Sequence, residues 1–322
     1  MSQVNRWPDG RIPVPLSAHA RDLLGDAARA VLRYLDRHPA ATVAAVGGQL
    51  VATRRTQRHR AVVRARDREE LAAGLRAVAG AAEHPLVARN AGGTAPRIAF
   101  VFPGQGTQWP AMGAQAYREL AQYRAEVDAC AEAFVAAGAL SPVRYLTAPA
   151  GPEPGDPNAY SETEIEAAQF THAVALAGVW RSYGVLPDVT VGHSLGEVGA
   201  AYIAGALTLP DAASVIIARA GVVERLRGRY AVAELGIDAD AARDVIAATP
   251  GWRELSVGNA ASSVAVSGAR DAGSAAVARV RDQGRFAREI TVGFPVHTSI
   301  LEPLHDELQR QLPPSEFAEP PE

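Results

Sequence analysis

The chain has 322 residues, of which 48% are hydrophobic and 21% are charged, and its net charge is −3. This length favours two or three domains, and the apolar fraction excludes wholesale disorder and a collagen-like composition. All 32 basic residues are Arg, and residues 1–97 hold 16 of them against 8 acidic residues, a net charge of +8. Such a basic segment before an acidic body indicates an interaction surface or an internal interface, and by itself it does not indicate nucleic acid.

The cysteine content and the hydropathy limit the class of protein further. Cys130 is the single cysteine, which excludes an intramolecular disulfide and a Cys-x-x-Cys metal or redox site. No apolar stretch reaches about 18 residues, and the N-terminal residues lack the apolar core of a signal peptide. We therefore expect a soluble, cytoplasmic protein without a metal site or a membrane span.

Residues 1–95 alternate strand-like and helix-like segments. The expected elements are a strand at Ile12–Leu16, helices at Arg21–Arg37 and Ala40–Val51, a strand at His59–Ala65 and a helix at Arg68–Ala79. The stretch Ala81–Pro96 contains an Asn-Ala-Gly-Gly sequence and is typical of a linker. These patterns predict a small α+β subdomain over residues 1–95.

A repeated order of strand, glycine turn and helix begins near residue 96. Arg97–Phe102 and Val189–Val191 are predicted as buried strands, and Glu164–Tyr183 as a long helix. Ala148–Pro157 is rich in Pro and Gly and is predicted as a surface loop. The order is typical of an α/β fold with a parallel sheet, an α/β-hydrolase-like core that we assign to residues 96–228 and 293–322.

The order of elements changes between residues 229 and 292. Strands are expected at Tyr230–Ile237, Leu255–Ala260, Val264–Ser267 and Phe286–Val292, and helices at Asp238–Ala248 and Ala272–Gln283. This βαββαβ order is typical of the ferredoxin-like split unit. Residues 229–292 are therefore predicted to form a ferredoxin-like subdomain inserted into the α/β core.

The strongest motif is Gly192-His193-Ser194-Leu195-Gly196-Glu197, which lies between a predicted strand and a predicted helix. This is the context of a nucleophile elbow, in which flanking glycines permit the strained turn that exposes the serine hydroxyl. The helix that follows directs its N–H groups toward a developing oxyanion. A glycine turn with a capping serine is the alternative, and the context favours Ser194 as a nucleophile.

A serine hydroxyl needs a base to accept its proton, and His297 is the best placed of the eight histidines. His297 follows Phe294-Pro295-Val296, where a predicted strand gives way to a loop, and catalytic groups collect at strand ends in open α/β sheets. The side chain of His193 is expected to diverge from the neighbouring serine. No acidic third member is evident, so we predict a Ser–His dyad in which backbone carbonyls can orient the imidazole.

Two further segments carry candidate site residues. In Phe102–Gly106 the glycines give Gln105 a tight backbone position, from which its N–H and that of Leu195 can form an oxyanion hole. Trp109 occupies the third glycine position of a dinucleotide-binding pattern, which argues against that class of site. Arg219 lies in an apolar run, and it either pairs with an acid of the fold or awaits a substrate carboxylate.

Taken together, these residues resemble the malonyl-CoA:ACP transacylase family. The resemblance is carried by Phe102–Gly106, Gly192–Glu197, Arg219, Asn259 and Phe294–His297. More narrowly, the chain resembles the acyltransferase domain of a modular polyketide synthase, and its first ninety or so residues resemble the ketosynthase–acyltransferase linker subdomain. Gly192–Val198 and Phe286–Leu304 are similar to segments of polyketide synthases that contribute to mycobactin-type siderophores.

The resemblance implies a transfer in two steps. Ser194 attacks the thioester of malonyl-CoA with His297 as the base, and the acyl group then passes to the phosphopantetheine thiol of an acyl carrier protein. The implied partners are this carrier protein and a ketosynthase or other synthase domains, with no bound cofactor, nucleic acid or membrane. The +8 segment is expected to face a ketosynthase or an acidic carrier protein.

The resemblance also assigns roles to the other site residues. It implies that Arg219 holds the free carboxylate of the malonyl group and that Gln105 and Leu195 form the oxyanion hole through their N–H groups. Asn259 and His193 are expected to support the active site.

Two departures from the family pattern concern the acyl group. Ala220 follows the arginine where the family usually has Ser. Phe294, Pro295 and Val296 precede His297 where the family often has His-Ala-Phe for malonyl or Tyr-Ala-Ser for methylmalonyl. The version with Pro is closer to that of discrete malonyl transacylases. We therefore expect malonyl-CoA rather than methylmalonyl-CoA, with residues 294–296 setting specificity.

Two other functions use the same residues differently. An editing thioesterase could use the same Ser–His pair, although Arg219 argues against it because editing targets usually lack a free carboxylate. A non-enzymatic module that spaces neighbouring domains is the third interpretation.

Only 25 residues, 298–322, follow His297, whereas family members usually continue with further strands and helices. The expectation is a C-terminally truncated core that is partly open and correspondingly less active.

Overall fold

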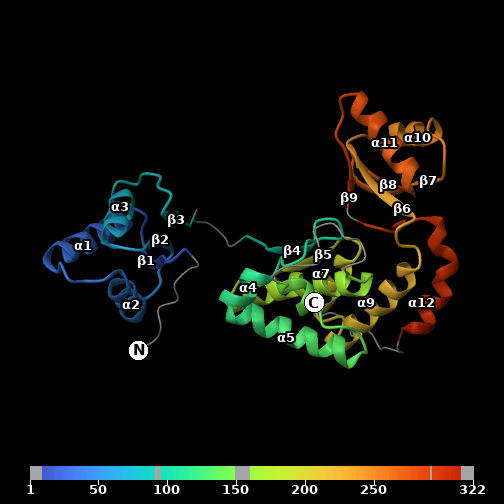
Figure 1. Ribbon diagram of the computed structural model, residues 1–322. Helices are drawn as coiled ribbons and strands as arrows, with labels where there is room; N and C mark the ends of the chain where they lie inside the picture. The colour runs from blue at the N-terminus through green and yellow to red at the C-terminus, as the bar shows by residue number, and fades with distance from the viewer. Residues whose placement is uncertain (1–8, 91–95, 149–159, 291, 313–322) are drawn as a thin grey trace. The chain divides into compact units, whose positions relative to one another are not determined.

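The chain divides into two compact units, Met1–Pro96 and Arg97–Glu322, in a computed structural model (Figure 1). The structure describes residues 9–90, 96–148, 160–290 and 292–312. The predictions for linker residues 91–95, for loop residues 149–157 and for residues 313–322 lie outside these ranges. None of the described helices is long and apolar enough to cross a membrane.

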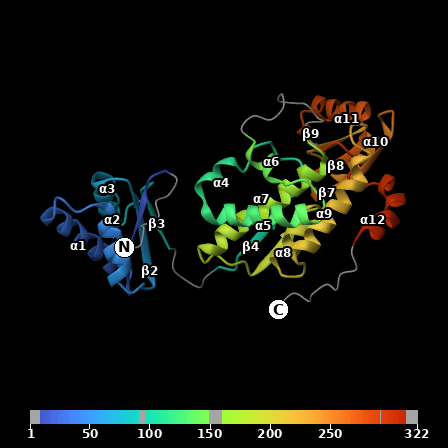
Figure 2. The same ribbon diagram turned by 60° about the horizontal axis from the view of Figure 1, so that its bottom comes forward.

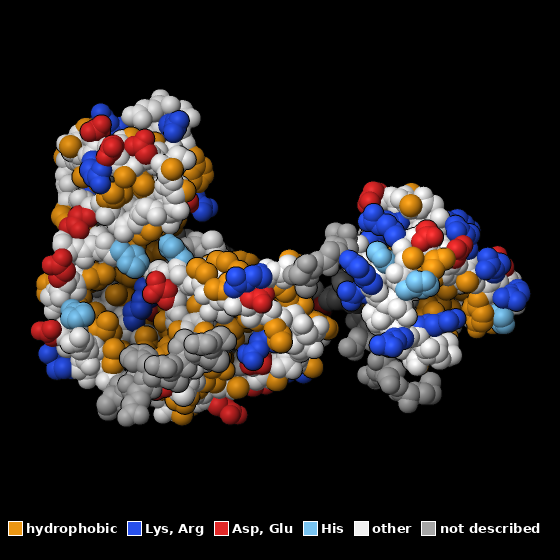
Figure 3. All heavy atoms as spheres, turned by 180° about the vertical axis from the view of Figure 1, so that it is seen from behind, with side chains coloured by type: hydrophobic (Ala, Val, Ile, Leu, Met, Phe, Trp, Pro, Cys, Tyr) orange, Lys and Arg blue, Asp and Glu red, His pale blue; other side chains and the backbone are white. Residues whose placement is uncertain are grey.

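The first unit is a three-stranded antiparallel sheet with three helices packed against it. Its strands β1 (Ile12–Ala18), β2 (His59–Ala65) and β3 (Val87–Arg89) pair in the order β1-β2-β3. Its helices are α1 (Leu23–Arg37), α2 (Val43–Thr53) and α3 (Arg68–Ala79). Alternate residues of β1 are buried because successive side chains of a strand point to opposite faces. Basic side chains are spread over the face of this unit seen in Figure 3.

Strand β3 corrects the sequence prediction, because it lies inside the stretch expected to be only a linker. Three residues are too few to show a period of two, so β3 leaves no pattern in the sequence. Its pairing with β2 extends the sheet by a short edge strand.

The α/β core of the second unit is built on the parallel pair β4 (Ala99–Phe102) and β5 (Val189–Gly192). Its helices are α4 (Ala114–Glu119), α5 (Ala121–Ala136), α6 (Val143–Thr147), α7 (Glu162–Ser182), α8 (Gly196–Ile203) and α9 (Leu209–Glu224). Helices α5, α7 and α9 pack side by side, as Figure 2 shows. Helix α7 begins at a capping box in which the side chains of Ser161 and Glu164 satisfy each other's backbone N–H groups.

The two parallel strands are not buried, contrary to the sequence prediction. Val101 is 70% exposed, and Val189 and Val191 are also exposed, whereas Phe102 on the other face is buried. Parallel strands covered on both faces read as continuous apolar runs, and this pattern led to the expectation of burial. In the described part of the chain, helices cover one face of this sheet, the face toward Phe102 and α8.

A four-stranded antiparallel sheet with two helices follows the core. Its elements are β6 (Tyr230–Leu235), α10 (Ala239–Ala247), β7 (Arg253–Ala260), β8 (Ser263–Ala269), α11 (Arg270–Asp282) and β9 (Ala287–Ile290). The strand order β7-β8-β6-β9, with every neighbouring pair antiparallel, is that of the ferredoxin-like split unit. The chain then returns to the core through a 3₁₀ helix, η1 (Ser299–Leu304), and α12 (His305–Gln311), which packs against α9.

Candidate active site

Ser194 lies at the turn between β5 and α8, and its φ of 52° is in the left-handed region. A Cβ on Gly192 would lie 2.2 Å from Cα of Glu197, and one on Gly196 would lie 2.1 Å from the carbonyl oxygen of Phe102. Both contacts are with backbone, so neither position can hold a larger residue without moving the chain. These two glycines therefore produce the sharp turn that the motif predicts.

The structure brings the two predicted catalytic residues together. Nε2 of His297 lies 2.9 Å from Oγ of Ser194, although 103 positions separate them in the sequence. This is the distance that a general base needs to accept the hydroxyl proton. His297 also has a positive φ, 50°, and it lies after β9, in the segment that links the split unit to η1.

The surroundings of His297 favour the neutral imidazole. Burial of part of the ring, followed by the charge of Arg219 and the neighbouring His193, lowers the pKa of His297 below its ordinary value of 6.5. Glu197 opposes these effects. The imidazole is therefore neutral near pH 7, which is the form that can accept a proton. Among the described residues, neither an acid nor a carbonyl hydrogen-bonds to Nδ1, so the orienting group expected from the sequence is not identified.

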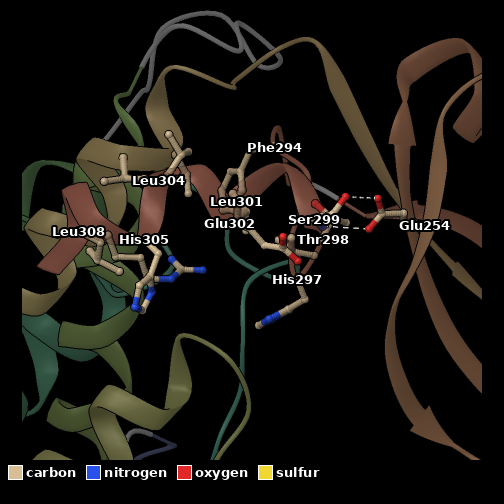
Figure 4. A pocket seen from close by; sticks show the side chains of 14 residues that line it. Glu254, Phe294, His297, Thr298, Ser299, Leu301, Glu302, Leu304, His305 and Leu308 are labelled. Atoms are coloured by element: carbon tan, nitrogen blue, oxygen red, sulfur yellow. Dashed lines mark hydrogen bonds between the residues drawn. The ribbon is translucent and has the colours of Figure 1, made fainter.

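The segment around His297 is fixed by the split unit. Glu254 of β7 accepts hydrogen bonds from the backbone N–H of Ser299, at 2.9 Å, and from its hydroxyl (Figure 4). Ser267 of β8 donates to the carbonyl oxygen of Val296 at 3.1 Å. These contacts hold the chain on both sides of the base. Glu254 was not predicted as a site residue, because it lies just before the predicted strand and no motif contains it.

The turn after β4 passes directly against the elbow. A Cβ on Gly104 would lie 2.8 Å from Nδ1 of His193 and 3.4 Å from Cβ of Ser194. The adjacent Gln105 is therefore close to the nucleophile, and Leu195 follows the serine on the other side. This proximity is what an oxyanion hole formed by the N–H groups of Gln105 and Leu195 requires.

Arg219 on α9 pairs with an acid of the fold and also reaches a cavity, so both sequence readings describe part of its surroundings. Its side chain is 22% exposed and forms an ion pair with the fully buried Glu166 of α7. Oε1 of Gln105 lies 3.4 Å from Nη2 and 3.5 Å from Nη1 of the guanidinium. The ring centre of Phe294 lies 5.8 Å from Cζ.

Three buried acids of α7 were not predicted from the sequence. Glu162, Glu164 and Glu166 are all buried, at alternate positions in the first turns of a largely apolar helix, and this spacing is the signal that could have revealed them. Burial raises the pKa of Glu166 to about 7, with Glu162 adding to the effect and Arg219 opposing it. An acid of this kind beside the expected substrate-binding arginine is part of the site.

A cavity of about 800 Å³ adjoins the dyad and is lined by Arg219 and His297. Phe294 and Val296 also lie on its wall, while Pro295 is buried and is not among the lining residues. Apolar side chains complete much of the lining: Val222 and Val223 of α9, and Leu301, Leu304 and Leu308 of η1 and α12 (Figure 4). Two of the three predicted specificity residues therefore face a space large enough for an acyl chain.

The two predicted supporting residues differ in their positions. His193 is exposed and packs against Gly104, beside the dyad. Asn259 is exposed near the end of β7, at a bulge opposite β8, and lies five positions after Glu254 in the sequence. At about 3.3 Å per residue, the two ends of that strand are far apart, and Glu254 is the one near the dyad. Within the described ranges the side chain of Asn259 forms no hydrogen bond, and its supporting role stays a prediction.

Comparison with known proteins identifies relatives of this chain. Residues 99–320 match the family model described as the acyl transferase domain. The spectinabilin polyketide synthase system protein NorA' of Streptomyces orinoci is 36% identical over 307 residues, which are 94% of this chain and 8% of that protein. The chain therefore spans a small part of the length of this relative.

Solved structures of acyltransferase domains are also similar to this chain. The domain from module 8 of the salinomycin polyketide synthase is 32% identical, with a TM-score of 0.76, over 94% of this chain and 71% of that one. The acyl transferase domain of SpnD, in complex with 2-(pent-4-yn-1-yl)malonyl, is 29% identical, with a TM-score of 0.72, over 94% of this chain and 69% of that one.

Proposed function

Because this chain belongs to the acyl transferase domain family of enzymes, we propose that it moves a malonyl-type extender unit from CoA to the phosphopantetheine thiol of an acyl carrier protein. The acyl group passes through an ester on Ser194. The observation that carries the proposal is the 2.9 Å distance between Oγ of Ser194 and Nε2 of His297 at the tip of a strained elbow.

The proposed chemistry uses groups of the chain itself and no bound cofactor. Neutral His297 accepts the hydroxyl proton as Oγ of Ser194 attacks the thioester carbonyl, and the N–H groups of Gln105 and Leu195 stabilise the oxyanion. As the tetrahedral intermediate collapses, the C–S bond breaks and His297 returns the proton to the sulfur of CoA. The carrier-protein thiol then attacks the ester in the same way and gives its proton, through His297, to Oγ of Ser194.

Arg219 is proposed to hold the free carboxylate of the extender unit. A guanidinium can bind a carboxylate with two parallel hydrogen bonds, and Arg219 lies on the cavity wall beside the base. The malonyl derivative in the SpnD structure supports this substrate class. Phe294 and Val296 on the same wall would exclude larger substituents, and we propose malonyl in preference to methylmalonyl.

The proposed protein partners are the carrier protein and neighbouring synthase domains such as a ketosynthase, with the basic first unit as one contact surface. The salinomycin and spectinabilin relatives are polyketide synthases, which supports this setting. A siderophore product and a cytoplasmic location stay predictions from the sequence. An editing thioesterase would use the same dyad without needing Arg219.

Replacing Arg219 by Ala is expected to slow acylation by malonyl-CoA by roughly 10- to 100-fold, the factor that corresponds to a lost hydrogen-bonded charge pair. Acylation by acetyl-CoA, which lacks the carboxylate, should change little. Release of free CoA measures both rates, and Arg243→Ala, on the exposed face of α10, is the matched control. An equal loss with both substrates would mean that Arg219 supports the fold and does not bind the carboxylate.

A further inference from the structure

Glu166 has a role that the two-step transfer does not account for. Its side chain is fully buried, and one carboxylate oxygen, Oε1, accepts a hydrogen bond from Nη1 of Arg219. The other oxygen, Oε2, has no hydrogen-bond partner among the described residues. A buried carboxylate oxygen without a partner is costly while it carries charge, and protonation removes that cost.

The contacts of Arg219 leave one edge of its guanidinium available. Nη1 donates to Glu166, and Nη1 and Nη2 both face Oε1 of Gln105. Within the described ranges, Nε–H and the second N–H of Nη2 have no partner, and these two donors form one side of the planar group. Such an edge can bind a carboxylate bidentately. Glu166 and Gln105 thus hold Arg219 so that this edge is the one left for a substrate.

The charges around this arginine already include more acids than bases. Glu162 accepts a hydrogen bond from the side-chain amide of Gln105, and one of its carboxylate oxygens lies 3.8 Å from Nε of Arg227. Glu224 accepts a hydrogen bond of 2.5 Å from the backbone N–H of Glu162. The titratable and charged groups facing Glu166 are Arg219 and Glu224 of α9 and Glu162 of α7, with Arg227 beside them, and burial raises the pKa of Glu162 as well. Three acids and two arginines give this cluster a net charge of −1 when all are ionised. A substrate carboxylate would add a second negative charge.

We propose that Glu166 is a specificity-determining residue that positions Arg219 for the free carboxylate of the acyl group and takes up a proton from solvent when that carboxylate binds. The proposal rests on the proposed function, since it takes a carboxylate-bearing acyl-CoA as the ligand of Arg219. The proton goes to Oε2, while Oε1 keeps its hydrogen bond from Arg219, so the arginine stays in place but is no longer neutralised by its buried partner.

Burial makes this proton available near neutral pH, because it raises the pKa of Glu166 to about 7. A second carboxylate at Arg219 raises this pKa further, since like charges disfavour ionisation. Binding of malonyl-CoA therefore weakens as the pH rises above 7, whereas binding of acetyl-CoA adds no charge at this site and does not. The ratio of the two affinities isolates the contribution of the carboxylate to binding, because both ligands contain the same CoA.

The test is a calorimetric titration of the full chain carrying Ser194→Ala, which binds acyl-CoA without becoming acylated. Titrations with malonyl-CoA and acetyl-CoA, in two buffers with different heats of ionisation, report the number of protons taken up. Binding of malonyl-CoA between pH 7 and 8.5 is expected to be accompanied by proton uptake by the protein, and binding of acetyl-CoA is not. The malonyl-to-acetyl affinity ratio is expected to fall by up to about tenfold per pH unit in this range.

Adding Glu166→Gln tests the residue itself, because the amide oxygen can still accept from Arg219 but carries no charge. This variant is expected to bind malonyl-CoA about tenfold more tightly at pH 8, without proton uptake. Glu132→Gln, which neutralises an exposed acid on α5, is the matched control and should behave as the parent does. The proposal would be overturned if the chain carrying Ser194→Ala alone took up no proton on binding malonyl-CoA, or if proton uptake persisted after Glu166→Gln. Failure of the wild-type chain to acylate Ser194 would instead contradict the proposed function, which these titrations do not require.

Discussion

Replacing His297 by Ala is expected to slow acylation of Ser194 by roughly 10²- to 10⁴-fold, the usual contribution of a general base. The 2.9 Å contact with Oγ provides the route for the proton, and no other group among the described residues is hydrogen-bonded to that hydroxyl. The residue is exposed as a whole and only part of its ring is buried, so its removal should leave the stability of the fold nearly unchanged. The rate of CoA release in a single turnover measures the effect.

The pH dependence of the wild-type chain provides a second readout of the same base. Because the pKa of His297 is lowered, the neutral base persists below pH 6.5, and activity should fall only at more acidic pH. His19→Ala, at an exposed histidine of the first unit, is the control and should keep the wild-type rate and profile. A His297→Ala variant that retains rapid acylation would exclude this histidine as the base.

Replacing Gly196 by Ala is expected to lower the free energy of unfolding by about 3 kcal/mol and to abolish acylation. The added methyl group would lie 2.1 Å from the carbonyl oxygen and 2.6 Å from the carbonyl carbon of Phe102. Phe102 is the residue that pairs with Gly192 in the parallel sheet, so relief of this clash must separate β4 from the elbow. Denaturant unfolding and CoA release measure the two effects.

Gly258→Ala is the matched control for this substitution. Gly258 lies in β7, its φ is not positive, and an added Cβ would meet no atom within 4 Å. Its replacement should change stability by no more than about 0.5 kcal/mol. If Gly196→Ala were as stable and active as this control, the tight contact between the elbow and β4 would not exist in solution.

Local sequence patterns predicted the helices and strands that are long enough to show a periodic pattern. The alternation in His59–Ala65 matches β2 residue for residue, and the order of strands and helices after residue 229 matches the split unit. The nucleophile-elbow motif selected Ser194 and the strand-end position selected His297, and the structure places these two residues in contact. These predictions succeeded because a periodicity or a glycine turn depends on residues that are close together in the sequence.

The rest depends on contacts between distant segments, which the patterns do not contain. The exposure of Val101 was missed because an apolar strand looks the same whether one face or both are covered. Arg219 and Glu166 pair across two helices although they are 53 positions apart in the sequence, and the residues alone left that arginine's partner open. Asn259 was expected at the site from the resemblance, yet the sheet register places it near the far end of β7.

The central claim is that Ser194 becomes an acyl-enzyme, and intact-mass measurement of the full chain tests it most directly. After incubation with malonyl-CoA, the wild-type chain is expected to gain the mass of one malonyl group, and the Ser194→Ala chain to gain none. Addition of a phosphopantetheinyl carrier protein should move that mass to the carrier. No mass gain on the wild-type chain, or an equal gain on the Ser194→Ala chain, would contradict this account.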